Sequence, residues 1–212
     1  MKKFLFLAAS VCAMSYIQPV FAEDKAAPVT PINVEHYTFD KAHTQILFFV
    51  DHLGFSKSQG EFLDFDGFFN FDLEHPEKSN VDVSINVSGL DMDDDKWNTH
   101  MKSADLFDIE KFPTMTFKST AIEVTGKKTA NITGDFTLLG VTKPVVLAVT
   151  HNKSDKHAFS GGKYVSGFSA TTTIKRSEFG MQYGLPMVGD DVEIRIEVEG
   201  LRSEAEAAPE SE

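Results

Sequence analysis

Apolar and polar residues alternate with a period of two along most of this chain. Residues 81–87 carry Val, Val, Ile and Val at the odd positions with polar side chains between them, and residues 192–199 repeat the pattern. Neighbouring side chains of a strand point to opposite faces, so this alternation predicts strands that are apolar on one face. Less regular runs predict further strands at 44–51, 115–118, 121–125, 129–138, 144–151 and 164–174.

The segment 60–75, GEFLDFDGFFNFDLEH, contains five phenylalanines. Its odd positions from 63 to 73 are apolar or glycine, whereas five of the seven even positions from 62 to 74 are polar. This predicts a half-buried strand, or a hairpin that bends near Gly67. Phenylalanines on the polar face would cover a helix or loops, or form a dimer contact. The pattern places Phe65, Phe69 and Phe71 on the apolar face and Phe62 and Phe68 on the face of the aspartates.

Two segments depart from the period of two and are predicted to be helical. Residues 94–107 begin with Asp, a good N-cap, and place Trp97, Met101 and Leu106 on roughly one side. A second short turn of helix is expected at 176–180. Hairpin-length loops separate the strands, and one of them carries Gly140 and Pro144. About eight strands joined in this way predict an antiparallel, mainly β fold.

Strands that are apolar on one face must pack against a second sheet or close on themselves. Closure into a barrel removes exposed sheet edges, and a barrel of eight strands can enclose one small ligand. Periodicity does not decide between barrel and sandwich. It also leaves open whether the inward side chains pack on each other or line a cavity.

The chain begins with the features of a secretory signal peptide. Lys2 and Lys3 precede a short apolar run, and Val20 to Ala22 form a small-x-small cleavage site. We expect cleavage after Ala22 and export to the periplasm. Val11 before Cys12 argues against a lipoprotein signal. The predicted organisation is a signal peptide (1–22), a linker (23–34), one barrel domain (35–202) and a disordered acidic tail (203–212).

Charge and cysteine content exclude several classes of protein. The formal net charge is −12, and cleavage after Ala22 removes two lysines and no acid, giving −14. Such a surface repels phosphate backbones, so nucleic-acid binding is excluded and membrane contact would be transient at most. Cys12 is the only cysteine, so the mature chain has no disulfide and no cysteine-ligated metal.

Motifs for catalysis or metal binding are incomplete. Residues 91–102 resemble a calcium loop at its first, third and fifth positions, but Lys96 and Lys102 occupy the positions of its Gly and Glu. Residues 167–171, GFSAT, lack the last Gly of a nucleophile elbow. A metal site from His43, His100 or His151 would need the fold to gather them. We therefore expect no catalytic residue, no metal and no cofactor.

Five ordered blocks resemble one known family. They are YTFDKAHTQILFFVDHLGFSKSQGEF (37–62), FPTMTFKST (112–120), GDFTLLGVTKPV (134–145), IKRSEFGM (174–181) and VGDDVEIRIEVEG (188–200). Together they are similar to the YceI-like family of exported, lipocalin-like barrels, also called polyisoprenoid-binding proteins. One segment departs from the family's R-D-x-H-L pattern: Trp97 replaces a charge, His100 is kept and Met101 replaces Leu.

The resemblance implies a closed, lipocalin-like barrel with a long apolar pocket. It also implies binding of an amphipathic isoprenoid-type lipid, polyprenyl or isoprenoid quinone, and a possible homodimer. We therefore expect an exported lipid carrier and not an enzyme. The alternative is a periplasmic interaction module whose barrel is filled by its own core. The candidate binding residues are the apolar Phe48, Val50, Phe65, Phe69, Phe71, Val83, Ile85, Met115, Phe117, Phe168 and Ile174, with His43, Trp97, His100 and Arg176 for a polar head.

Overall fold

The computed structural model describes residues 34–159 and 161–203. The predicted signal peptide lies outside these residues, as do nearly all of the linker and the acidic tail. Within the described residues the fold consists of eleven strands, one α-helix and three 3-10 turns. The strands are β1 (Glu35–Phe39), β2 (Gln45–His52), β3 (Ser56–Phe62), β4 (Phe65–Phe71), β5 (Asn80–Asn86), β6 (Leu90–Asp91), β7 (Thr114–Val124), β8 (Thr129–Leu138), β9 (Val141–Lys156), β10 (Tyr164–Lys175) and β11 (Val188–Arg202).

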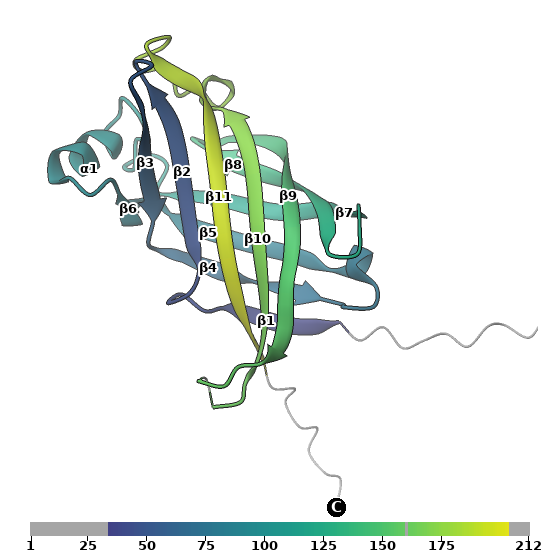
Figure 1. Ribbon diagram of the computed structural model, residues 1–212. Coiled ribbons are helices and arrows are strands. Elements are labelled where there is room, and N and C mark those ends of the chain that lie inside the picture. The colour runs from purple at the N-terminus through teal and green to yellow at the C-terminus, as the bar shows by residue number, and fades with distance from the viewer. Residues whose placement is uncertain (1–33, 160, 204–212) are drawn as a thin grey trace, which may run out of the picture. The chain divides into compact units, whose positions relative to one another are not determined.

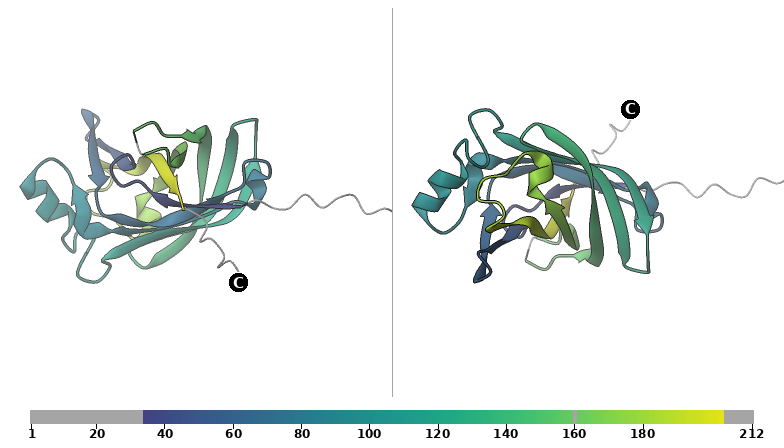
Figure 2. Two further views of the ribbon diagram at one scale, coloured as in Figure 1. Left: turned by 90° about the horizontal axis from the view of Figure 1, so that it is seen from below. Right: turned by 90° about the horizontal axis from the view of Figure 1, so that it is seen from above.

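Eight strands form a closed ring in which every neighbouring pair is antiparallel. The order around the ring is β1-β4-β5-β7-β8-β9-β10-β11, and β1 pairs with β11 to close it. Tyr37 of β1 lies opposite Arg202 of β11 on one side and Phe69 of β4 on the other. Figures 1 and 2 show the strands wrapping around a common interior. The predicted closed antiparallel barrel of about eight strands is confirmed, and the sandwich is excluded.

The strands β2, β3 and β6 extend the wall at one end of the barrel. β2 pairs with β11 and with β3, and β3 pairs in turn with β6. Residues 40–44 separate β1 from β2, and only Leu63 and Asp64 separate β3 from β4. At the first break the chain passes from the closed ring into the extension, and at the second it returns to the ring.

The break at Leu63 corrects the predicted alternation of the phenylalanine-rich segment. Alternation does not continue through the break, so Phe62 at the end of β3 is buried, whereas Leu63 is 59% exposed. Leu73, also placed on the apolar face by its parity, lies beyond the end of β4 and is 57% exposed. Phe68 keeps its predicted outward position, where its ring lies 5.1 Å from that of His36.

Two predicted turns are also corrected. Gly67 lies inside β4 and not at a hairpin; its φ of +145° suits glycine, and a Cβ there would collide with the backbone of β5. Pro144 lies inside β9, opposite Asp135 of β8. The β8–β9 turn consists of Leu139 and Gly140 alone, both with positive φ, which fits a two-residue hairpin. β9 therefore begins at Val141, earlier than predicted, and continues to Lys156.

Both predicted helical segments form, but the first is shorter than the predicted 94–107, because the helix ends at Met101 and residues 102–107 lie in turns and a bend. The helix α1 (Asp95–Met101) begins after Asp94, whose side chain accepts hydrogen bonds from the amides of Lys96 and Trp97. The short 3-10 turns are η1 (Pro76–Lys78), η2 (Val87–Gly89) and η3 (Arg176–Phe179). No helix in residues 34–159 and 161–203 is long and apolar enough to cross a membrane.

Candidate ligand-binding site

The barrel encloses a cavity of about 570 Å³, within the range of about 300–1,000 Å³ that small-molecule sites occupy. Its wall consists mainly of inward-pointing aliphatic and aromatic side chains, because every strand of the ring turns its apolar face inward. The long run on β11 contributes Val192, Ile194, Ile196 and Val198. The interior is therefore hollow, and its own side chains do not fill it.

Fourteen of the fifteen predicted site residues line this cavity. The eleven apolar ones come from β2, β4, β5, β7 and β10. Trp97, His100 and Arg176 line it near one end. His43 does not line it; the residue lies in the link between β1 and β2, beside a smaller pocket formed with β9, β10 and β11.

Four polar or aromatic side chains surround one end of the cavity, which we call the mouth. They are His52 at the end of β2, Trp97 and His100 on α1, and Tyr183 in the connection between η3 and β11. The ring centroids of His52 and Trp97 lie 6.2 Å apart, and those of His100 and Tyr183 lie 5.0 Å apart. The mouth thus brings together three segments that are distant in sequence.

Arg176 is buried beside the mouth and organises the connection to β11. Its Nε donates to the Gly189 carbonyl at 2.7 Å and one Nη2 proton to Val188 at 3.0 Å. Its Nη1 donates to the carbonyls of Met181 and Tyr183 at 3.2 and 2.9 Å. Burial lowers the pKa of this guanidinium. Four of its five N–H groups are therefore engaged by backbone, and contact with a headgroup stays a prediction.

The carboxylate of Asp190 completes this corner of the mouth. It accepts hydrogen bonds from the amide and the hydroxyl of Ser177, at 2.9 and 2.8 Å. These bonds, together with the charges of Lys175 and Arg176, lower the pKa of Asp190. The start of β11 is in this way fixed to η3 by side chains from both elements.

A half-buried histidine lies toward the other end of the cavity. The ring of His151, on β9, lies 5.2 Å from both Phe71 and Phe168. Its Nε2 is 2.8 Å from the hydroxyl of Ser154, which is 2.7 Å from that of Ser166. Burial lowers the pKa of His151, and the charge of Lys128 lowers it further. Both effects favour the neutral imidazole, a polar group in an aromatic wall.

Three side chains beside the smaller pocket could hold a metal ion. Asp40, His43 and Glu199 each offer a ligand atom, and these atoms lie within 4.8 Å of one another. Nδ1 of His43 lies 3.0 Å from Asp40 Oδ2, which raises the pKa of His43 and lowers that of Asp40. The contact between Asp40 and His43 explains why these two side chains lie together without a metal.

The YceI-like domain profile matches residues 37–200. The chain belongs to the YceI-like family. It is 41% identical over 168 residues to a UPF0312 protein of Ectopseudomonas mendocina, an alignment that covers 78% of this chain and 87% of that relative. A UPF0312 protein of Azotobacter vinelandii is 40% identical over 168 residues, with 78% and 86% covered.

Solved structures of this YceI-like fold agree with the barrel. Burkholderia cenocepacia BcnA superposes with a TM-score of 0.69 at 25% identity, over 76% of this chain and 98% of its own. Campylobacter jejuni YceI gives 0.65 at 30% identity, over 73% and 90%. A polyisoprenoid-binding domain from Saccharophagus degradans gives 0.57 at 11% identity, over 81% and 100%, a likeness of fold alone.

Several residues that line this YceI-like barrel are not among the site residues predicted from the sequence. His151 has the same parity as Val145, Leu147 and Val149, which line the cavity, so the extended alternation of β9 could have identified it. The β11 residues were recognised as a strand face and omitted from the site. Tyr183 lies in an irregular connection and carries no periodic signal.

Proposed function

We propose that this protein is an exported carrier that holds one isoprenoid-type lipid, a polyprenyl lipid or an isoprenoid quinone, inside its barrel. The observation that carries the proposal is the open interior of about 570 Å³ with an apolar wall. Membership of the YceI-like family supports it, and so does the fold shared with a domain described as polyisoprenoid-binding. The absence of a complete catalytic motif in the sequence favours binding over catalysis.

Hydrophobic burial explains why the barrel would retain such a lipid, but not why it would prefer one lipid over another. Each isoprene unit removes roughly four CH₂ equivalents from water, or about 3 kcal/mol. The same unit is already out of water in a bilayer, so transfer from membrane to barrel gains little. Selection then rests on shape and on polar contacts at the ends of the cavity. Trp97 and His100 at the mouth and His151 in the aromatic wall can supply these contacts.

The same proposal places the protein in the periplasm. Its support is the leader at residues 1–22, with cleavage after Ala22. A homodimer is proposed as well, with the outward ring of Phe68 on β4 as a candidate contact. No cofactor or metal is required for carrying a lipid.

Lipid extraction tests the carrier function directly. Protein purified without detergent from its native host is extracted with organic solvent, and the extract is analysed by mass spectrometry. We expect an isoprenoid lipid near one equivalent per chain. No lipid in the extract, together with no uptake of a quinone-like fluorescent probe, would show that the proposal is wrong.

A pair of variants on β10 locates the bound lipid. Ala170 is buried and lines the cavity, whereas its neighbour Thr171 is exposed on the outer face. Ala170→Phe should fill part of the cavity and reduce probe uptake by about tenfold or more, whereas Thr171→Phe should leave it unchanged. Equal uptake by the two variants would place the lipid outside the barrel.

A further inference from the structure

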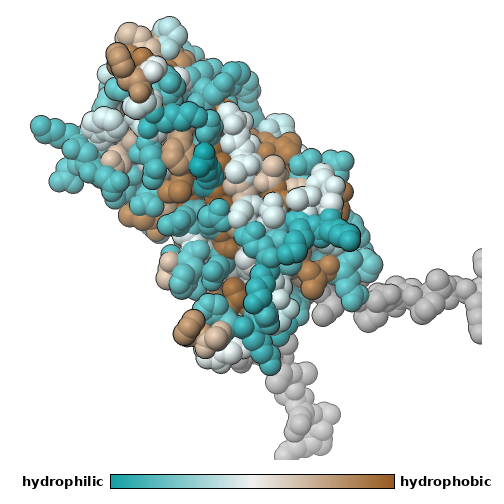
Figure 3. Space-filling model, viewed as in Figure 1, coloured by the Kyte–Doolittle hydropathy of each residue, from teal (hydrophilic) through white to brown (hydrophobic). Residues whose placement is uncertain are grey.

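Large apolar side chains are exposed around the mouth of the cavity. Phe55 is 88% exposed, Met187 65% and Tyr183 50%. Leu53 and Trp97 are each exposed by almost half. Figure 3 shows hydrophobic residues exposed at this upper end of the molecule. We call these five residues the apolar rim. A soluble chain gains nothing from presenting them to water, so they indicate a surface that contacts something else.

The tip of the β2–β3 hairpin is built to present two of these side chains. Leu53 and Gly54 both have positive φ, at +59° and +73°. Positive φ is unusual for leucine and favours a small polar residue or glycine. The turn is held by hydrogen bonds from the Phe55 amide to the His52 carbonyl (3.1 Å) and from the Gly54 amide to Asp51 Oδ1 (2.9 Å). The apolar tip is therefore a fixed projection.

The rest of the rim is attached to the same mouth. The Leu53 amide donates to the Met187 carbonyl at 3.1 Å, which joins the hairpin to the connection before β11. His52 and Tyr183, which line the cavity, are close neighbours of Leu53 and Met187 in sequence. Trp97 both lines the cavity and is exposed. The rim therefore adjoins the cavity wall, and Trp97 and Tyr183 belong to both.

We propose that the apolar rim inserts into the surface of a phospholipid bilayer, so that the cavity opens toward the acyl chains. Aromatic side chains with a polar edge, such as Trp97 and Tyr183, favour the membrane–water interface. Projecting Phe, Leu and Met side chains can enter the region below the headgroups. The membrane contact stands on the rim alone; its use in loading lipid rests on the proposed function.

The charge near the mouth defines which bilayer the rim fits. Asp93, Asp94 and Asp95 precede or begin α1 and are exposed beside Trp97, with Lys96 as the adjacent cation. The whole chain has a formal net charge of −12. Anionic headgroups would repel this surface, so the partner is a bilayer rich in zwitterionic lipid. Salt should strengthen binding to anionic vesicles by screening the repulsion.

Trp97 provides the measurement, because it is the only tryptophan of the chain. The purified mature protein is titrated with vesicles of phosphatidylcholine, with and without bromine on the acyl chains. Insertion is expected to shift the emission to shorter wavelength and to cause quenching by the brominated lipid. Vesicles with half of the lipid replaced by phosphatidylglycerol should bind more weakly at low salt. No emission change with any vesicle would overturn the proposal.

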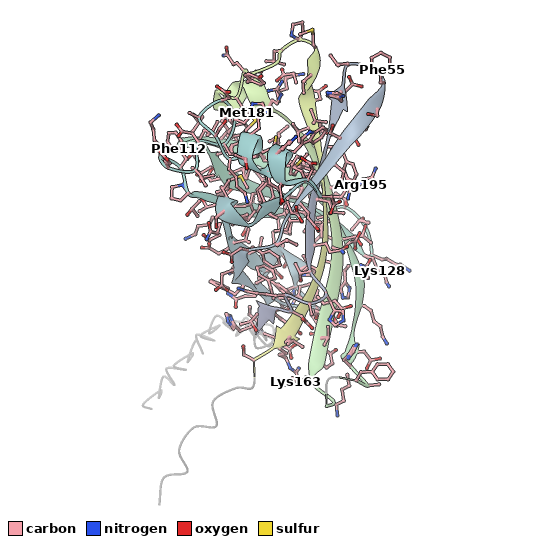
Figure 4. The ribbon with its side chains drawn as sticks, turned by 90° about the vertical axis from the view of Figure 1, so that its left-hand side faces the viewer. Phe55, Phe112, Lys128, Lys163, Met181 and Arg195 are labelled. Carbon is pink, nitrogen blue, oxygen red and sulfur yellow. The ribbon has the colours of Figure 1, made fainter. Side chains whose placement is uncertain are left out.

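Phe55 and Phe159 form a matched pair of variants. Phe159 is 96% exposed and lies in the β9–β10 connection. Figure 4 shows Phe55 at one end of the barrel and Lys163, of that connection, at the opposite end. Phe55→Ser combined with Met187→Ser should weaken vesicle binding by about tenfold or more, whereas Phe159→Ser should leave it unchanged. Equal loss in both would contradict insertion by the mouth.

Two further measurements distinguish membrane docking from a dimer contact and from the carrier function. If the rim instead pairs two copies, sedimentation velocity will show a dimer that Phe55→Ser with Met187→Ser dissociates, with no vesicle binding by the wild type. Uptake of a quinone-like probe from solution tests the cavity independently of the rim. Loss of vesicle binding with retained uptake supports docking by the rim; vesicle binding without uptake would leave docking intact and reject the carrier function.

Discussion

The ring of Phe69 on β4 lies against Gly200 on β11. A Cβ at position 200 would collide with the Cε1 and Cζ atoms of that ring. The φ of Gly200 is not in the positive region, so the glycine is required by the close approach and not by the backbone. Phe69 also stacks on Tyr37, with centroids 4.8 Å apart and an interplanar angle of 8°. This contact fills the point where β1, β4 and β11 close the ring.

Replacing Gly200 by Ala should therefore destabilise the barrel. The added methyl would displace the Phe69 ring, and overpacking of this kind typically costs about 1–3 kcal/mol. Urea unfolding monitored by circular dichroism measures the loss. Gly167, on the neighbouring β10, is the control, because a Cβ there would meet only ordinary contacts. If the Gly200→Ala and Gly167→Ala variants are equally stable, the ring does not constrain position 200.

His151 predicts a pH dependence of stability. Its pKa is lowered in the folded protein by burial and by Lys128. The unfolded chain therefore takes up a proton first as the pH falls below about 6.5, the ordinary histidine value, and the contribution to stability decreases. The wild type should lose stability from pH 7 to pH 5 more steeply than His151→Gln. Parallel curves for the two proteins in urea unfolding would contradict this.

Arg176→Met should be among the most damaging single changes at the mouth. It removes the donor that serves four backbone carbonyls and leaves them in a buried site, with an expected cost of about 3 kcal/mol. Thermal unfolding measures the change. The adjacent Lys175→Met is the control, because the exposed Lys175–Asp191 pair should contribute less than about 1 kcal/mol.

The proposed homodimer is tested at Phe68. This ring points outward from β4 beside His36. If it forms the contact, sedimentation velocity should show a dimer for the wild type and a slower species for Phe68→Ser. Unchanged sedimentation of the variant would remove Phe68 from the interface, and a monomeric wild type would reject the dimer.

Export predicts a defined mature N-terminus. Protein recovered from the periplasm of its native host should begin at Glu23, and its mass should correspond to 190 residues. Intact mass spectrometry measures this directly. Replacement of Ala22 by Pro should block processing, so that the longer precursor accumulates.

The antiparallel β fold was predictable because alternation is strong along most of its strands, whereas the choice of a closed barrel over a sandwich came from the family resemblance. The runs of β5 and β11 identify their inward faces without any partner. β1 and β3 were not predicted as strands, because β1 is short and SKSQGEF of β3 is mostly polar, and both take their extended form from hydrogen bonds to neighbouring strands. The burial of Phe62 was missed for a related reason. Two residues between β3 and β4 interrupt the alternation, and this interruption is visible only from the pairing of the two strands.

The apolar lining of the cavity was predictable from the sequence, but the arrangement of residues at the mouth was not. Apolar parity placed eleven residues on the cavity surface. The mouth depends instead on connections that bring His52, Trp97 and Tyr183 close together. No spacing in the sequence predicts this proximity. His43 lies in a segment that resembles the family and was a candidate for contact with a polar head, yet its position in the link after β1 takes it outside the main cavity.

Closure of the ring by β1 and β11 also determines when the barrel can form during synthesis of the chain. Tyr37 pairs with Arg202, so the last barrel contact joins residues near the two ends of the domain. Contacts of such long sequence separation form slowly, on the scale of milliseconds to seconds for all-β domains. The barrel therefore cannot close until β11, its final strand, has been synthesised.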